Sequence, residues 1–217
     1  MSAETNTVPS SPAELLGDAH PLIEQLGSPE EFLAAPAGRD LFAFTTVRDL
    51  ASLRCFLDEY RARVLEPVEL PAIVAAHGHA TRGEARELIL LDQRLAAEVA
   101  LREFTMASCR VGQRQLSKLR PLRDRRVVGR YLAAIESGDA RGWHTLVYGV
   151  SLAMFSLPLR QGLQNYVEQT TAVLVGRAVA SLRLPEATDV ALQTEQSSHV
   201  ARLVSAAVAG AGPLRIC

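Results

Sequence analysis

Cysteine is scarce in this chain, and its placement argues against two kinds of architecture. The three cysteines, Cys55, Cys109 and Cys217, are odd in number and include no close pair. A disulfide framework or a zinc site built on paired cysteines is therefore not expected. Free thiols are typical of a reducing compartment, so the pattern favours a cytoplasmic protein.

A net charge of one sign is also missing. Lys and Arg total 23 and Asp and Glu total 24, which gives a formal net charge of -1. The chain has no excess of basic residues that would favour nucleic acid as a partner. It also has no excess of acidic residues that would indicate a solvating tail. Each apolar run is interrupted before about 18 residues, the length that a membrane span needs, so no span is expected. Residues 1–14 lack the basic and apolar regions of a secretory signal, so none is expected.

The sequence has none of the short motifs that mark common catalytic sites. It lacks a Gly-rich phosphate loop followed by Lys and Ser or Thr, a GxSxG elbow and a HExxH helix. Its acidic pairs, Glu30-Glu31 and Asp58-Glu59, are sequence neighbours, and adjacent positions on a helix do not converge on one point. We therefore predict a protein that is not an enzyme and has no bound cofactor of its own.

Helical periodicity dominates what the chain does contain. Apolar residues recur at three- and four-residue spacing, and no strand-like alternation repeats. The pattern predicts an all-α, single-domain bundle of roughly eight to ten helices joined by short loops. The expected helices are two short ones before residue 37 and further ones over residues 47–66, 67–79, 84–99, 101–119, 127–136, 142–157 and 158–184. A last helix is expected to start at Pro185-Glu186 or at Thr188 and to reach residue 204.

Two helix ends are expected from proline and capping residues. Glu66-Pro67 is expected to stop the helix that begins near Val47, because proline lacks the N–H that an interior turn needs. Thr81 and Glu84 have the spacing of a capping box, so they are expected to open the next long helix.

The helical domain is expected to span residues 13–210. Residues 1–12 are rich in Ser, Thr and Pro, and we expect this segment to be disordered. Glycine and proline near residue 210 are expected to release residues 211–217 as a flexible tail.

Residues 142–184 are expected to lie at the centre of the bundle. They form two apolar helical patterns joined at Leu157-Pro158, and a proline at the start of the second helix costs little. Small residues such as Gly149, Gly162 and Gly176 would let neighbouring helices approach closely. Together with a mean hydropathy of +0.08, these faces predict self-association as a homodimer.

His77 and His79 are weak candidate metal ligands. They lie near an expected helix end, and imidazole suits nickel, copper or zinc. No third ligand is visible nearby in the sequence. The alternative is an exposed helix C-terminus, where the helix dipole favours histidine.

A basic run occupies residues 110–130. Its members are Arg110, Arg114, Lys118, Arg120, Arg123, Arg125, Arg126 and Arg130. The first three are four residues apart, so they share one helix face. The run is a solvated face, a docking surface for an acidic protein or a nucleic-acid site. Nucleic acid ranks last, because no aromatic residues that could stack on bases are interleaved with the basic ones.

Four helical segments carry a family resemblance. They are residues 49–57 (DLASLRCFL), 108–116 (SCRVGQRQL), 143–150 (WHTLVYGV), and the helix after Leu157-Pro158-Leu159 that contains Tyr166 and leads into Ala178-Val179. In this order, they resemble the UreF family of urease accessory proteins. Residues 21–31 depart from the family's Gly-rich N-terminal signature, and residues 184–189 depart from the segment after the long helix.

The resemblance implies an all-α, dimeric, cytoplasmic adaptor with no chemistry of its own. Adaptors of this family bind a UreD/UreH scaffold and recruit the GTPase UreG, and the assembly delivers nickel to apo-urease. The resemblance therefore implies those three partners, with nickel handled by the complex and neither nucleic acid nor membrane bound. The alternative is a non-urease all-α interaction or regulatory protein with a basic docking face.

The resemblance also implies candidate interface residues. His144 and Tyr148 are expected either to fix the central helix as buried polar groups or to line an interface. Tyr166 would lie on the helix that meets the scaffold partner, and the helix over 108–116 would shape the core or the dimer face. The candidate set is Ser108, Arg110, Gly112, Arg114, His144, Tyr148 and Tyr166.

Overall fold

One long helix organises the part of the chain that the structure describes. The computed structural model describes residues 47–98, 105–116 and 118–210. All regular elements in these ranges are helical, in agreement with the expected all-α class. The two short helices expected before residue 37, the segment 1–12 and the tail 211–217 lie outside the described residues.

The long helix consists of three consecutive elements without a break. α4 (Leu50–Tyr60) continues into the π-helix η1 (Arg61–Glu69) and then into α5 (Leu70–Arg82). Asp49 caps its start, because the Asp49 carboxylate accepts a hydrogen bond from the Ser52 N–H at 2.8 Å. The Asp49 N–H in turn donates to the Ser52 hydroxyl oxygen at 2.9 Å, which completes a capping box.

The predicted break at Pro67 is wrong, because the helix accommodates this proline in its π-helical segment. The Leu70 N–H donates to the Leu65 carbonyl, five residues back, as in a π-helix. This wider turn absorbs the proline, which otherwise clashes with the carbonyl four residues back in an α-helix. Two predicted helices therefore merge into one. The described residues form seven helices, besides one 3-10 turn, rather than eight to ten.

The predicted capping box at Thr81 and Glu84 is also wrong. Thr81 still lies in α5, where its hydroxyl donates to the His77 carbonyl at 2.8 Å. Gly83 ends α5 in the left-handed conformation, with φ of 73°, which glycine adopts without strain. Glu84 then precedes α6 (Ala85–Leu95), and its side chain makes no capping hydrogen bond.

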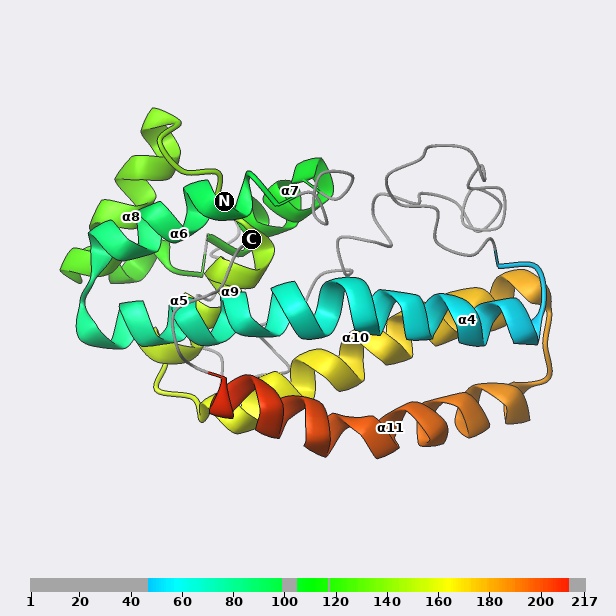
Figure 1. Ribbon diagram of the computed structural model, residues 1–217. Coiled ribbons are helices and arrows are strands. Elements are labelled where there is room, and N and C mark those ends of the chain that lie inside the picture. Colours follow the sequence, from blue (N-terminus) through cyan, green and yellow to red (C-terminus); the bar gives the residue numbers. More distant parts are fainter. Residues whose placement is uncertain (1–46, 99–104, 117, 211–217) are drawn as a thin grey trace, which may run out of the picture.

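A second group of helices packs at the end of the long helix where α5 lies (Figure 1). It contains α6, α7 (Thr105–Leu116), the 3-10 turn η3 (Arg120–Leu122), α8 (Arg126–Ser137) and α9 (His144–Met154). α9 packs against α5 and α7, and α8 packs against α6. α8 ends at Gly138, which has φ of 84°, close to the end at residue 136 that the sequence predicts.

The last two helices form an antiparallel hairpin along the long helix. α10 (Leu159–Leu182) and α11 (Glu186–Ala209) pack on each other and on α5. The predicted joint at Leu157-Pro158 is confirmed, because α9 ends at Met154 and Pro158 is the N-cap of α10. A tight turn at Arg183, with φ of 52°, reverses the chain between the two helices.

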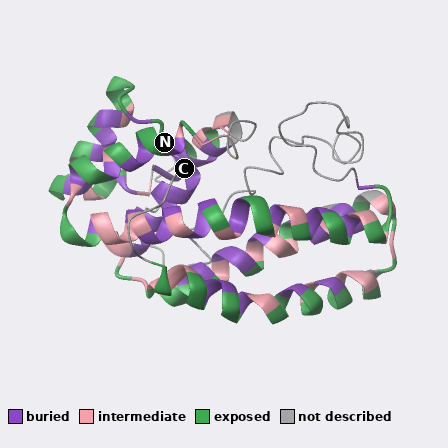
Figure 2. Ribbon diagram, viewed as in Figure 1, coloured by how far each residue is buried: buried purple, intermediate pink, exposed green. Residues whose placement is uncertain are grey.

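α9 lies at the centre, as expected for the stretch that contains it. Its residues from His144 to Leu152 are all buried, whereas α10 and α11 each keep an exposed face (Figure 2). A helix that is buried all round must be apolar or have its polar groups satisfied by neighbours. Among the helices that the structure describes, none is both long and apolar enough to cross a membrane.

Candidate functional site

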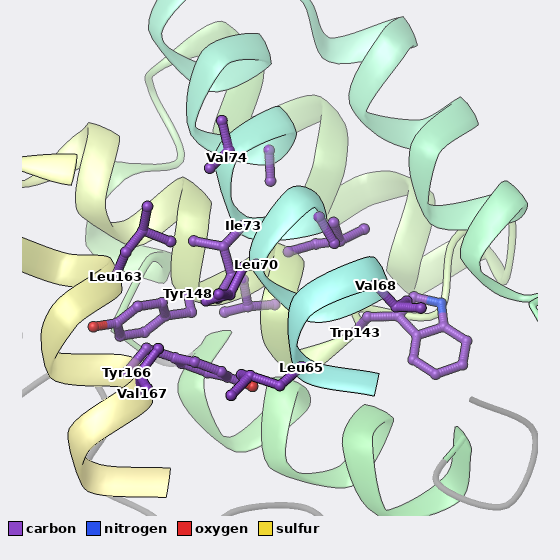
Figure 3. Packing of buried hydrophobic residues seen from close by; sticks show 14 of the residues in the cluster. Leu65, Val68, Leu70, Ile73, Val74, Trp143, Tyr148, Leu163, Tyr166 and Val167 are labelled. Atoms are coloured by element: carbon purple, nitrogen blue, oxygen red, sulfur yellow. The ribbon is translucent and has the colours of Figure 1, made fainter. Parts of the chain in front are cut away.

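Three of the candidate residues meet in the interior, between α9 and α10. The ring centroids of His144 and Tyr166 are 5.8 Å apart, and those of Tyr148 and Tyr166 are 5.4 Å apart. In Figure 3, the two tyrosines lie among apolar side chains such as Leu65 and Leu163. The Tyr148 hydroxyl donates to the Gly162 carbonyl at 2.9 Å, which ties α9 to α10. Burial raises the pKa of Tyr148, so its hydroxyl stays protonated as a donor.

His144 connects this ring cluster to α7. Its backbone N–H donates to the Ser108 hydroxyl oxygen at 3.2 Å. Its ring atom Nδ1 lies 3.1 Å from Oε1 of Gln115, a hydrogen bond in the tautomer that carries the proton on Nδ1. Ser108, Gln115 and His144 are all buried. Within this chain, Ser108 and His144 therefore position the start of the central helix.

A buried carboxylate that sequence reasoning missed completes the polar centre. Glu69, at the end of the π-helix, is only 6 % exposed. The Tyr60 hydroxyl donates to its Oε2 atom at 2.6 Å, and the Tyr166 hydroxyl bonds to the same carboxylate. Burial first, and then the charge of Glu69, raises the pKa of both tyrosines well above the usual value. Both therefore remain hydrogen-bond donors to Glu69: the Tyr60 bond lies within the long helix, and the Tyr166 bond holds the π-helical segment against α10.

A second buried acid, Asp92 on α6, holds the loop that leads into α9. Asp92 is fully buried, and its carboxylate accepts hydrogen bonds from the Arg141 N–H at 2.7 Å and the Gly142 N–H at 3.0 Å. The Tyr131 hydroxyl donates to it at 2.8 Å, and the Trp143 indole donates to the Asp92 carbonyl at 3.2 Å. The sequence contains one indication that Asp92 is buried, because Asp92 follows Leu88 by four residues and so lies on the apolar stripe of its helix.

Two glycines are required where helices touch through their backbones. A Cβ atom at Gly112 would overlap the Gly142 carbonyl oxygen and lie 2.9 Å from the His144 nitrogen. A Cβ atom at Gly149 would lie 2.5 Å from the Ile73 carbonyl oxygen. The predicted close approach is thus confirmed at Gly149. It does not apply to Gly176, where an added Cβ would meet nothing within 4 Å.

The remaining candidates lie at the surface. Arg110 and Arg114 are exposed on α7, away from the ring cluster. The basic run continues around η3 and the start of α8 as what we call the basic corner, which consists of Lys118, Arg120, Arg123, Arg125, Arg126 and Arg130. All of these except the half-buried Lys118 are exposed. The candidate residues therefore divide into a buried group around His144 and an exposed basic group, and their roles toward a partner remain predictions.

The two histidines proposed as weak metal ligands lie near the end of α5. Nδ1 of His79 is 2.8 Å from Oε2 of Glu84, and the same oxygen lies 2.8 Å from Nη2 of Arg82. His77 is half-buried, and burial lowers the pKa of its imidazole. Across the ranges that the structure describes, no group of three His, Cys, Asp or Glu residues could hold a metal ion.

The Glu84 contacts give a pH-dependent prediction. The hydrogen bonds from Arg82, and next that from His79, lower the pKa of Glu84 to about 2. Because the pKa of Glu84 is lower in the folded chain than in the unfolded chain, the contact stabilises the fold above the ordinary glutamate pKa of 4.5, and this contribution is lost as the pH falls toward 2. Urea unfolding measures the free energy of unfolding of the parent and of Glu84→Gln. The parent should be the more stable protein at neutral pH, and the difference in free energy should become smaller at low pH. A difference in the free energy of unfolding that stays the same at both pH values would contradict the lowered pKa of Glu84.

The described part of the chain is a helical bundle with a polar centre. Its buried polar groups hold helices and loops in place, and its exposed basic groups lie on α7 and around η3 and the start of α8. Residues 47–209 match the family model of UreF, and the chain therefore belongs to the UreF family. UreF proteins are urease accessory proteins rather than catalytic enzymes. No curated protein matches the chain. The match begins after residues 21–31, where the sequence departs from the family signature.

Proposed function

We propose that this protein is an adaptor in urease maturation that links a UreD/UreH scaffold to the GTPase UreG during nickel insertion into apo-urease. The family match over residues 47–209 is the observation that carries the proposal. The construction of the described residues supports it, because the polar side chains at the centre are used to fix helices. Nickel is then handled by the assembled complex, in the cytoplasm, and this chain supplies contacts rather than chemistry.

The exposed basic residues of α7 are the proposed contact points. Arg110 and Arg114 are exposed four residues apart on one helix, which suits an acidic surface of a partner protein. Ser108, Gly112, His144, Tyr148 and Tyr166 support that surface from inside, because they set the positions of α7, α9 and α10. Charge reversal at the two arginines should therefore weaken docking and leave the fold intact.

Reconstitution of urease activation tests the adaptor role. Cells that lack this gene and contain its urease, scaffold and GTPase genes should make inactive urease that nickel in the medium does not rescue. The parent gene should restore urease activity, and the protein that it encodes should co-purify with the scaffold and the GTPase. Arg110→Glu/Arg114→Glu should lower this recovery about tenfold, the size expected for two lost charge contacts. Arg160→Glu, on the exposed surface of α10, is the matched control. Fully active urease without the gene would refute the adaptor role.

The alternative is an interaction or regulatory protein outside urease maturation that uses the basic face. The observation that favours it is the exposure of five arginines in the basic corner. In that case, affinity capture would recover an acidic protein unrelated to urease, the complex would dissociate at high salt, and urease activation would not require the gene.

The adaptor is further proposed to act as a homodimer. Val173 on α10 and Val190 on α11 are exposed large apolar residues of the hairpin, with 38 % and 64 % of their surfaces accessible. Apolar surface of this kind supports association of two copies. Sedimentation velocity at micromolar concentration should give the mass of a dimer, and a monomer at all concentrations would contradict the proposal.

A further inference from the structure

The charges of this nearly neutral chain are strongly separated along the sequence. Residues 1–46 contain seven acidic residues and one basic residue, which gives a net charge of −6. Because the whole chain carries −1, residues 47–217 carry +5. Residues 118–130 contain six basic residues and one acidic residue, a net charge of +5. One short stretch therefore accounts for the positive excess, and one terminal segment accounts for the negative excess.

Four arginines of the basic corner lack local compensation for their charge. Arg123, Arg125, Arg126 and Arg130 are exposed and form no ion pair with any residue that the structure describes. Arg120 pairs with Glu136, but at 3.7 Å and with both side chains largely exposed. Such a pair contributes little, because water screens exposed charges. The corner therefore attracts anionic groups.

The start of α8 adds to this attraction. Arg125 is the N-cap of α8 and Arg126 is its first residue, yet the first turn contains no acidic residue and no side-chain cap. The N-terminus of a helix carries partial positive charge, so two arginines there are electrostatically unfavourable without an anion. An acidic occupant would relieve this repulsion and could accept hydrogen bonds from the free N–H groups of the first turn.

We propose that the acidic segment 1–46 docks on the basic corner of its own chain. Its charge of −6 complements the +5 of residues 118–130. Because the segment is covalently attached, its effective concentration at the corner is in the millimolar range, which favours it over an acidic protein in solution.

The length of the segment permits this contact. The described chain begins at Val47, beside the start of α4, whereas α8 packs with α6 at the opposite end of the long helix (Figure 1). At about 1.5 Å per residue, the helix over residues 50–82 is about 50 Å long. Residues 1–46 reach at most about 150 Å when fully extended, at about 3.3 Å per residue. The segment can therefore reach the corner with chain to spare.

A carbodiimide cross-linking experiment on the full chain tests the proposal. This reagent joins an amine to a carboxylate that it contacts, and the only lysine of the sequence, Lys118, lies at the basic corner. Arg126→Lys adds a second amine to the corner, and Arg160→Lys adds one on the exposed surface of α10 as a control. We expect peptides that join the corner lysines to carboxylates of residues 1–46 in the monomeric product. Their yield should be about tenfold above that of the control, because the tether acts on both positions and only the corner adds electrostatic attraction for the segment.

Two further measurements make the proposal falsifiable. The yield should fall about tenfold in about 0.5 M NaCl, where the screening length is about 4 Å. Neutralising the segment by Glu24→Gln, Glu30→Gln and Glu31→Gln should lower it similarly, since these positions lie outside the described fold. Equal yields at the corner and at the control would overturn the proposal. Cross-linking can also be carried out on a mixture of isotope-labelled and unlabelled chains. Cross-linked peptides that join a labelled chain to an unlabelled chain would overturn the proposal, because the contact would then be intermolecular.

Discussion

Asp92→Asn is expected to cost about 3 kcal/mol of the free energy of unfolding, because it places an amide where two backbone N–H groups and a tyrosine hydroxyl need an acceptor. Asp92 is fully buried, so water cannot replace the lost acceptor. The Arg141 and Gly142 N–H groups and the Tyr131 hydroxyl donate to its two oxygens at 2.7 to 3.0 Å. The loop before α9 should loosen first, and with it the position of the central helix.

Urea unfolding followed by circular dichroism measures this effect. Asp124→Asn, at an exposed position beside the basic corner, is the matched control and should change stability by less than about 0.5 kcal/mol. Hydrogen exchange of the Gly142 N–H should also accelerate in Asp92→Asn well beyond the global loss of stability. A variant at Asp92 that is as stable as the control would contradict the structural role assigned to this carboxylate.

Gly149→Ala is expected to destabilise the protein by about 2–3 kcal/mol, a typical cost of overpacking a tight core. The added Cβ would lie 2.5 Å from the Ile73 carbonyl oxygen and 3.0 Å from the Ala76 Cβ. The obstacle is the backbone of α5, so no side-chain rotation can relieve the contact. α9 would have to move away from α5, and the ring cluster around His144 would move with it. Gly112→Ala should behave similarly, since its Cβ would overlap the Gly142 carbonyl oxygen.

Gly176→Ala provides the opposite expectation within the same chain. Nothing lies within 4 Å of a Cβ at this position in α10. Alanine should therefore stabilise the helix by about 0.5–1 kcal/mol, because glycine loses more backbone entropy in a helix. The urea concentrations at the midpoints of unfolding rank Gly149→Ala, Gly112→Ala and Gly176→Ala, provided that the free energy of unfolding falls with urea at the same slope in all three. A ranking in which Gly176→Ala is the least stable would mean that helix packing does not govern these sites.

The sequence was informative wherever a single residue determines the local backbone. Pro158 marks the start of α10, and Gly138 marks the end of α8, because each has a conformational preference that does not depend on distant contacts. Pro67 has the same local preference, yet the helix passes through it. The outcome there depends on the π-helical segment and on the contacts of Glu69 with Tyr60 and Tyr166, which are formed with the tertiary structure.

The candidate site was predictable in part for a similar reason. The motif positions His144, Tyr148 and Tyr166 were identified by resemblance, and the structure brings them together. Glu69 was missed because it follows Pro67 in what resembles a helix terminus, where an acidic residue is normally exposed. Its burial becomes evident only when α10 is packed against the π-helix. Contacts between helices that are distant in the sequence, rather than residue type, therefore determine which polar residues are buried at the centre.

The π-helical segment also sets the rotational phase of the long helix. Tyr60 and Glu69 are both buried and are hydrogen-bonded to each other, so they lie on one face of the long helix, yet they are nine residues apart, which is two and a half turns of an α-helix. In a pure α-helix, these two side chains would point in opposite directions. The wider turns of η1 make the same nine residues complete about two turns, which aligns the apolar faces of α4 and α5. Deleting one residue within η1 would therefore rotate α4 by about 100° relative to α5 and turn Leu53 and Phe56 away from the core.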